Sequence, residues 1–333
     1  MKNTPTTARA TNTDDRLYQF DPQFGFWGAP NLVREVTFET RPNESIQVAV
    51  RHNEDGNRDV QIPSIKDKTI VCFGGSHTWG GGVSQEVRYT EHLAKSTGSR
   101  VINMGHCSFG LDQVCLAILQ KSAKYNPKII VIEQHPWAIH RVLNNYVNGY
   151  VRPYFFLDTQ NTLKLQKVPY LAKYEAFRKI IGSYYSFRKE FLEFRGGINL
   201  KSGYDASIDP IFMYWKTRHY DAMYNLVDKI MCVIRDHCRQ NGIKLIFALG
   251  AIKQQLGPKS KSELIDFDLP RNRLIELLGK NNIAYVDMTS SMKAAHTEID
   301  PVMFADGHIN AKGHEVFAHT LFDELQARGW NTK

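Results

Sequence analysis

Short apolar runs alternate with amphipathic stretches along most of the chain. Each run is six to eight residues long and rich in Val, Ile, Leu or Phe, which is typical of strands buried on both faces. The runs are KTIVCFGG (68–75), RVINMG (100–105), PKIIVIEQ (127–134), IKLIFALG (243–250) and IAYVDM (283–288). Five such strands alternating with helices predict a three-layer α/β/α fold around a mainly parallel sheet of about five strands.

Two segments interrupt this alternation. Residues 18–67 carry the strand-like runs EVTFET and SIQVAV between turn signals, so we expect a small β-rich prefix. Residues 144–220 are rich in aromatic and basic side chains. We expect there a partly helical insertion over the carboxyl edge of the sheet, either as an ordinary packing layer or as a substrate wall. The main domain then spans 68–333, and polar residues 1–17 form a disordered tail.

Composition narrows the classes of function. The net charge of +8 comes from 42 Lys and Arg against 34 acids, spread along the chain. No zinc-finger or RNA-binding motif accompanies this charge, so we expect no nucleic-acid partner. The five cysteines are scattered in apolar stretches, which is typical of buried thiols in a reducing compartment. Without an apolar signal segment or a membrane-spanning run, we expect a cytoplasmic protein and no membrane partner.

The segment FGGSHTWGGGV, residues 73–83, holds the first candidate for chemistry. It follows the first core strand, so Ser76 should lie at the carboxyl edge of the sheet, where open α/β sheets bind ligands. The surrounding glycines allow a sharp turn and leave room for a substrate carbonyl, and the Ser76 amide can point at an oxyanion. A phosphate-binding loop is disfavoured because no GKS or GKT ending follows.

The partner of this serine lies near the other end of the chain, in FADGHINAKGHEVFAHTL, residues 304–320. A serine nucleophile needs a neighbouring imidazole, and that imidazole needs an acceptor on its other nitrogen. His308 can be the base and Asp306 the acceptor, with Asp300 as the alternative. Asn310 is expected to cap the last helix and so to fix this loop. The histidine spacing does not match a zinc motif, so we expect no metal.

In this order, the two segments resemble the first and last blocks of the SGNH/GDSL hydrolases, a superfamily of serine esterases and acyltransferases. VINMGHCSFGLDQ (101–113) is similar to the second block, and YNPKIIVIEQHPW (125–137) to the strand that leads into the third. The resemblance covers roughly residues 68–325. It implies the SGNH (flavodoxin-like) form of the α/β/α fold, ester chemistry and no cofactor. The implied catalytic triad consists of Ser76, His308 and Asp306.

Three positions depart from the family pattern. Gly75 stands where the family name has an aspartate, which is not a triad member. The oxyanion glycine of the second block aligns with Ser108, whose amide can serve equally. The third-block asparagine has no counterpart, and Trp137 stands near its place. Losing one such donor costs about 100- to 1,000-fold in turnover unless Trp137 or His135 substitutes. The expected oxyanion hole consists of Ser76, Ser108 and Trp137.

Further histidines follow strand ends and are expected to contact the substrate, although polar residues gather at strand ends in any case. These are His77, His106 and His135. Together the residues predict a serine-dependent ester hydrolase that removes a small acyl group, such as O-acetyl from a carbohydrate or related metabolite. An O-acyltransferase would use the same triad with a sugar hydroxyl as acceptor. A catalytically impaired SGNH-like binding module is the remaining alternative. The expected partner is a small-molecule or glycan ester, and the oligomeric state is left open.

Overall fold

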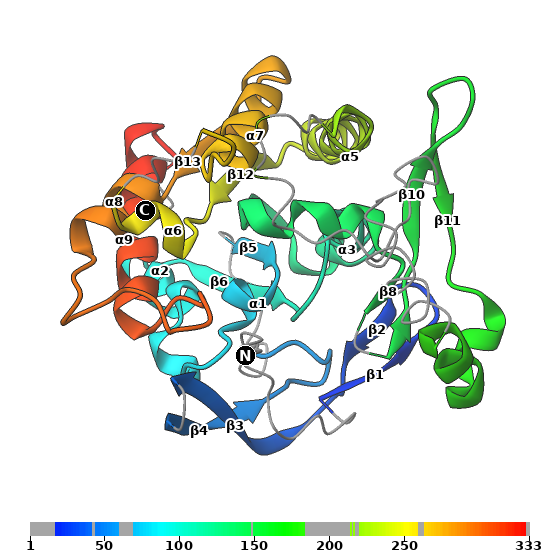
Figure 1. Cartoon of the computed structure of the whole chain (residues 1–333), viewed down its shortest axis with the longest axis horizontal. Helices are drawn as coiled ribbons and strands as arrows, with labels where there is room; N and C mark the ends of the chain where they lie inside the picture. Colours follow the sequence, from blue (N-terminus) through cyan, green and yellow to red (C-terminus); the bar gives the residue numbers. More distant parts are fainter. Residues whose placement is uncertain are drawn as a thin grey trace.

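A five-stranded parallel sheet lies at the centre of the molecule (Figure 1). The computed structural model describes residues 17–41, 44–59, 69–147, 149–183, 214, 216, 220–258 and 263–330. In spatial order the strands are β13 (Ala284–Asp287), β12 (Lys244–Leu249), β7 (Pro127–Gln134), β5 (Thr69–Gly74) and β6 (Arg100–Gly105). Every neighbouring pair in the sheet is parallel. The predicted sheet is therefore confirmed. The expected tail lies outside the described residues, except for Leu17.

Helices cover both faces of the sheet (Figure 1). One face carries α3 (Leu111–Lys121), α5 (Asp221–Gln240) and α7 (Leu269–Lys280). The other carries α2 (Tyr89–Thr97), α8 (Thr289–Ala295) and α9 (Ala311–Ala327). Successive residues of β5 point alternately into the two layers, and all six are buried. This explains why its sequence is apolar throughout, and it confirms the three-layer α/β/α fold.

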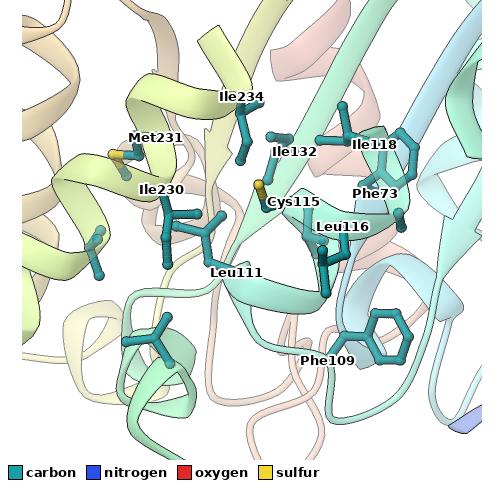
Figure 2. Packing of buried hydrophobic residues seen from close by; sticks show 14 of the residues in the cluster. Phe73, Phe109, Leu111, Cys115, Leu116, Ile118, Ile132, Ile230, Met231 and Ile234 are labelled. Carbon is teal, nitrogen blue, oxygen red and sulfur yellow. The ribbon is translucent and has the colours of Figure 1, made fainter. Parts of the chain in front are cut away.

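A cluster of apolar side chains packs between the sheet and helices α3 and α5 (Figure 2). The side chains labelled there are Phe73, Phe109, Leu111, Cys115, Leu116, Ile118, Ile132, Ile230, Met231 and Ile234. Burying a side chain of this size stabilises the fold by about 1.5–3 kcal/mol. Such packing aligns the strands, so that Phe73 of β5 pairs with Ile132 of β7. The carboxyl ends of the strands consequently lie at a common edge.

Short elements follow the strands at this edge. The one-turn helix α1 (Ser76–Trp79) comes directly after β5, and α6 (Lys253–Leu256) follows β12. Gly80 ends α1 because its φ of +88° is a left-handed conformation that glycine adopts without strain. The 3-10 segments in the core domain are η1 (Gln85–Val87), η2 (Ser122–Tyr125) and η3 (Pro136–Leu143). The nucleophile candidate is thus the first residue of a short, sharply terminated helix.

The N-terminal prefix consists of two antiparallel hairpins, as its turn signals predict. Their strands are β1 (Tyr18–Asp21), β2 (Gly25–Gly28), β3 (Val33–Arg41) and β4 (Glu44–Arg51). The chain then supplies Arg58, whose buried guanidinium donates to the carbonyls of Trp79, Gly80 and Val83. The prefix thereby holds the loop that follows α1.

The described part of the segment 144–220, expected to be partly helical, contains strands as well as a helix. It contains two hairpins, β8 (Tyr146–Val147) with β9 (Tyr150–Val151) and β10 (Tyr154–Leu157) with β11 (Leu163–Gln166). A 3-10 turn, η4 (Tyr170–Lys173), and a helix over 175–183 follow. The β10–β11 hairpin packs against α3 and α5 because its aromatic side chains, such as Phe155, join the core there. Residues 184–213 of this segment lie outside the described residues.

The cysteines and the helices are the features on which the composition-based expectations depend. All five cysteines are free thiols. Three of them, Cys72, Cys115 and Cys238, are buried in the apolar layers. Among the described residues, no helix combines the length and the apolar character that crossing a membrane requires.

Candidate active site

A cavity of about 630 Å³ opens at the carboxyl edge of the sheet. Its walls come from segments that follow four strands and from the loop before α9. The segments that contribute are the start of α1 with Ser76, the turn after β6 with Phe109 and Gly110, the start of η3 with Trp137, the start of α6 with Lys253, and the loop with Asp306 and His308. The cavity therefore stands where open α/β sheets bind ligands.

The predicted triad residues form one chain of hydrogen bonds in this cavity. The Ser76 hydroxyl lies 2.8 Å from Nε2 of His308, although 232 positions separate the two residues. Nδ1 of His308 lies 2.7 Å from Oδ2 of Asp306, and the His308 amide donates to Oδ1 at 3.0 Å. Because a carboxylate can only accept, it assigns the ring proton to Nδ1. Nε2 is then free to accept the proton of Ser76.

Asp306, and not Asp300, faces the imidazole. The Asp300 carboxylate instead pairs with Lys312 at 2.6 Å. Burial raises the pKa of Asp306, but the hydrogen bonds and charge of His308 outweigh it, so this pKa lies below its ordinary value. Asp306 therefore stays ionised and can hold the imidazole in orientation.

The loop that carries His308 is held by backbone and capping contacts. The Asn310 side chain accepts from the Gly313 amide at 3.0 Å, which confirms it as the cap of α9. Its amide group donates to the Pro301 carbonyl at 2.6 Å. Within the loop, the Phe304 amide donates to the His308 carbonyl at 2.8 Å. The imidazole of His308 therefore lies on a loop that its own backbone hydrogen bond closes and that the cap of α9 holds in place.

The chain is similar to solved esterases and lipases. A lipase/acylhydrolase from Enterococcus faecalis matches with a TM-score of 0.43 at 12% identity, over 78% of this chain and 96% of its own. The acetyl xylan esterase AlAXEase matches with a TM-score of 0.42 at 12% identity, over 77% and 98%. A protein described as a G-D-S-L family lipolytic protein from Desulfitobacterium hafniense matches with a TM-score of 0.41 at 11% identity, over 78% and 100%.

The sequence comparisons found no such relatives. No protein-family model matches the chain, and no curated protein matches it. With identities this low and TM-scores below 0.5, what the site does follows from its own geometry.

Three imidazole rings, those of His77, His135 and His308, stack beside Ser76. His77 lies between the other two, with its ring centroid 4.7 Å from that of His135 and 5.2 Å from that of His308. Burial, and then repulsion from the neighbouring imidazoles, lowers the pKa of His77 well below its ordinary value. Burial likewise lowers the pKa of His135 to about 3. Both rings stay neutral near pH 7, so they do not compete with His308 for the proton of Ser76.

The three histidines expected to contact substrate are placed differently. His77 and His135 line the cavity. His106 does not line it, which corrects the expectation from sequence. Its ring is fully buried, with its centroid 4.0 Å from that of Trp27 and 4.8 Å from that of Phe109. Trp27 of the N-terminal prefix covers His106. The residues around His106 in the sequence do not predict this contact, because Trp27 is distant along the chain.

Of the three expected oxyanion donors, Ser76, Ser108 and Trp137, only two line the cavity. Ser76 and Trp137 line the cavity, and the Ser76 amide, as the first of a helix, has no partner within that helix. Ser108 does not line the cavity and takes a left-handed φ of +65°. The turn presents Phe109 and Gly110 there instead. This corrects the expected role of Ser108.

Sequence reasoning missed a buried acid, Glu133, at the end of β7. It is 4% exposed, and its Oε2 accepts from the Gly75 amide and the Thr78 hydroxyl, both at 3.3 Å. Burial raises the pKa of Glu133 to about 7, against the lowering effect of these hydrogen bonds and of Arg141. An acid inside the apolar run PKIIVIEQ was the available signal.

Sequence reasoning also missed Arg141, which lies in η3 and lines the cavity. Its Nη1 donates to the Phe109 carbonyl at 3.1 Å, and it lies 3.3 Å from where a Cβ on Gly75 would stand. Burial, and then the charge of Arg152, lowers the pKa of Arg141 to about 10, so it remains a cation at neutral pH. The signal was a cation within the apolar segment PWAIHRVL.

Proposed function

We propose that the protein is a serine-dependent esterase that removes a small acyl group from an ester, with an O-acetylated carbohydrate or related metabolite as its substrate. The observation that carries this proposal is the hydrogen-bond chain from Ser76 through His308 to Asp306, at 2.8 and 2.7 Å, on the wall of the cavity. A hydroxyl, an imidazole and an ionised carboxylate in this order form the arrangement that activates serine for acyl transfer.

The first half-reaction acylates the serine. Oγ of Ser76 attacks the carbonyl carbon of the ester while Nε2 of His308 takes the hydroxyl proton. The carbonyl electron pair moves onto oxygen and gives a tetrahedral oxyanion. When this intermediate collapses, the bond to the leaving oxygen breaks, and His308 gives its proton to that oxygen. The products are the free alcohol and an ester of Ser76.

The second half-reaction releases the acid. Water attacks the acyl carbon while His308 takes its proton. When the new intermediate collapses, the bond to Oγ of Ser76 breaks and His308 returns the proton to Oγ, which gives the carboxylic acid and the free hydroxyl. Asp306 accepts the hydrogen bond from Nδ1 throughout and stabilises the imidazolium in each intermediate. A second alcohol in place of water would receive the acyl group through the same steps, which is the O-acyltransferase alternative.

The size and lining of the cavity support a small polar substrate whose ring has an apolar face. A volume of about 630 Å³ is typical of small-molecule sites. Trp137 lines the cavity with 37% of its surface exposed, and Tyr214 and Phe267 lie beside one another with ring centroids 5.1 Å apart. Aromatic faces of this kind pack against the apolar face of a sugar ring, while the polar wall around Ser76 receives the acyl group.

The test measures p-nitrophenol release from p-nitrophenyl acetate between about pH 6 and pH 9. Ser76→Ala should reduce turnover by about 10⁶-fold across this pH range. Ser84→Ala is the matched control, because Ser84 is exposed and does not line the cavity. Equal turnover in Ser76→Ala and the unaltered protein would overturn the proposal, as would the absence of turnover in both.

A second measurement tests the substrate class. Acetylated monosaccharides and oligosaccharides should be deacetylated with a higher kcat/KM than the aryl acetate, because their hydroxyl groups can hydrogen-bond the polar lining of the cavity while their rings pack on its aromatic wall. Rates on sugar acetates that are no higher would remove the carbohydrate part of the proposal. Binding of sugar esters without turnover, unchanged in Ser76→Ala, would instead identify a non-catalytic binding module.

A further inference from the structure

We propose that Arg141 is a catalytic residue whose guanidinium donates hydrogen bonds to the oxyanion of the tetrahedral intermediate. This inference rests on the proposed esterase function and adds to it a donor that sequence reasoning did not identify. Three observations support it: nearby backbone amides are already hydrogen-bonded, the guanidinium lies beside the start of α1, and its positive charge has no ion-pair partner among the described residues.

Few of the backbone amides at the start of α1 and in the turn after β6 can donate to an oxyanion. The Ser76 amide is one of them. The Phe109 amide already donates to the His106 carbonyl at 3.2 Å, and the Gly110 amide donates to Oε1 of Gln113 at 3.4 Å. Nε2 of His135 lies 3.0 Å from the Ala251 carbonyl, and a carbonyl can only accept, so this nitrogen carries the ring proton and uses it there.

Arg141 lies between the two backbone segments that border the reacting carbonyl. On one side its Nη1 is 3.3 Å from the Cβ position of Gly75, the residue before the nucleophile. On the other side the same nitrogen donates to the Phe109 carbonyl, and its Cβ is 3.1 Å from the Cβ position of Gly110. The guanidinium therefore stands beside the start of α1, on the wall that it shares with Ser76.

The guanidinium is held in place before substrate arrives. The Phe109 carbonyl fixes one of its five N–H groups, and the Trp137 ring centroid lies 5.3 Å from its central carbon. Donors that are fixed in advance stabilise developing charge without reorganising during the reaction. The remaining N–H groups can serve the oxyanion.

Among the described residues, Arg141 forms no ion pair within 4 Å, and the carboxylates of Glu133 and Asp112 attract its charge only from farther away. Nearby, Asp112 pairs with Arg152 at 2.7 Å, and Glu133 accepts from Gly75 and Thr78. A partly buried cation without a paired carboxylate is costly in the free protein. When negative charge develops on the carbonyl oxygen, its interaction with this cation becomes favourable. Because this interaction stabilises the transition state more than the ground state, it lowers the activation barrier.

The test compares Arg141→Gln, Arg141→Lys and Arg141→Ala on p-nitrophenyl acetate, an ester without charge. The glutamine variant should lose about 100- to 1,000-fold in kcat, with much less change in KM. The lysine variant should keep part of the rate because it retains a charged donor. Added guanidinium ion at millimolar concentration should restore part of the rate of Arg141→Ala, which a purely structural role would not allow. Arg273→Gln, on the surface in an ion pair with Asp221, is the matched control.

Several outcomes would overturn the proposal. A raised KM with an unchanged kcat would show that Arg141 binds the ground state, and a loss confined to carboxylate-bearing esters would show that it binds a substrate anion. Thermal unfolding and near-ultraviolet circular dichroism of each variant separate catalysis from folding, and loss of rate in step with loss of folding would also contradict it. If the unaltered protein lacks Ser76-dependent turnover, the esterase function fails and this role fails with it. If that turnover persists in every Arg141 variant, only this role fails.

Discussion

Two carboxyl groups near Ser76, those of the exposed Asp306 and the buried Glu133, have pKa values shifted in opposite directions, and their partners explain the difference. Burial raises the pKa of both. Asp306 accepts from the Nδ1 and the amide of His308 at 2.7 and 3.0 Å, which lowers its pKa below the ordinary value. Glu133 accepts only two longer hydrogen bonds, both 3.3 Å, from neutral groups, and its pKa remains at about 7. Asp306 is therefore a permanent anion, whereas Glu133 titrates close to neutrality.

This property of Glu133 predicts how stability depends on pH. The folded protein holds the Glu133 proton up to about pH 7, whereas the unfolded chain releases it near the ordinary pKa of 4.5. Between these values the folded state binds more protons, so stability falls as pH rises through this window. Glu133→Gln removes that titration. Its free energy of unfolding should gain about 3 kcal/mol relative to the unaltered protein between about pH 4.5 and 7.

Urea unfolding of both proteins at about pH 5 and about pH 7.5 measures this change. Buried histidines such as His77 and His135 have lowered pKa values and give the opposite slope, but they are present in both proteins and cancel in the difference. A constant difference in unfolding free energy across the two pH values would contradict the assignment.

At the scale of elements, the position of Ser76 depends on how closely α1 lies on β6. α1 is one turn long, so its place comes from packing rather than from its own helix stability. A Cβ on Gly105 would be 2.4 Å from the Trp79 amide nitrogen, and Asn103 donates to the Thr78 carbonyl at 2.5 Å. The helix that begins with Ser76 thus rests directly on the backbone of the neighbouring strand.

Gly105→Ala should therefore displace α1. We expect a loss of about 1–3 kcal/mol in stability, because backbone atoms cannot make room as a flexible side chain can. Turnover should fall as well, since the displaced helix carries Ser76. Gly279→Ala is the matched control. Gly279 lies exposed in α7 with nothing within 4 Å of its Cβ position, and alanine there should stabilise by about 0.4–1 kcal/mol. Thermal unfolding that moves equally in both variants would refute this account.

At the scale of the whole molecule, the N-terminal prefix and the α/β/α domain share one core. Phe24, Phe26 and Trp27 belong to the same apolar cluster as the residues of α3. The Arg58 guanidinium, fully buried above the Trp79 ring at 4.4 Å from its centroid, donates to three carbonyls around the end of α1. The prefix is therefore a part of the active-site scaffold rather than an independent attachment.

Arg58→Met tests this connection. Methionine is uncharged and has no donors, so the Val83 carbonyl would lose its Arg58 partner. The carbonyls of Trp79 and Gly80 would keep only the longer bonds from Arg88 at 3.5 Å and from the Val83 amide at 3.4 Å. We expect a loss of about 3 kcal/mol or more in stability, together with a fall in kcat, measured by urea unfolding and by aryl acetate turnover. Arg51→Met, at an exposed position of β4, should stay within about 0.5 kcal/mol. If the Arg58→Met variant were as stable and active as this control, the prefix would not support the site.

Local pattern in the sequence was enough to predict the sheet, the strand-end position of Ser76 and the loop that joins Asp306 to His308. Buried parallel strands must be apolar on both faces, and a sharp turn at a strand end requires glycine. Each of these features is therefore determined by a few neighbouring residues. The cap at Asn310 was readable for the same reason, because it satisfies an amide three positions away.

Tertiary structure alone decided which residues surround the nucleophile. Arg141 reaches Gly75 and Phe109 across the ends of two strands, His106 is covered by the distant Trp27, and the turn after β6 faces the cavity with Phe109 rather than with Ser108. The hairpins of the segment after residue 144 likewise pack on α3 and α5. Each of these outcomes depends on strand order and on packing between distant segments, and no spacing within one stretch of sequence encodes them.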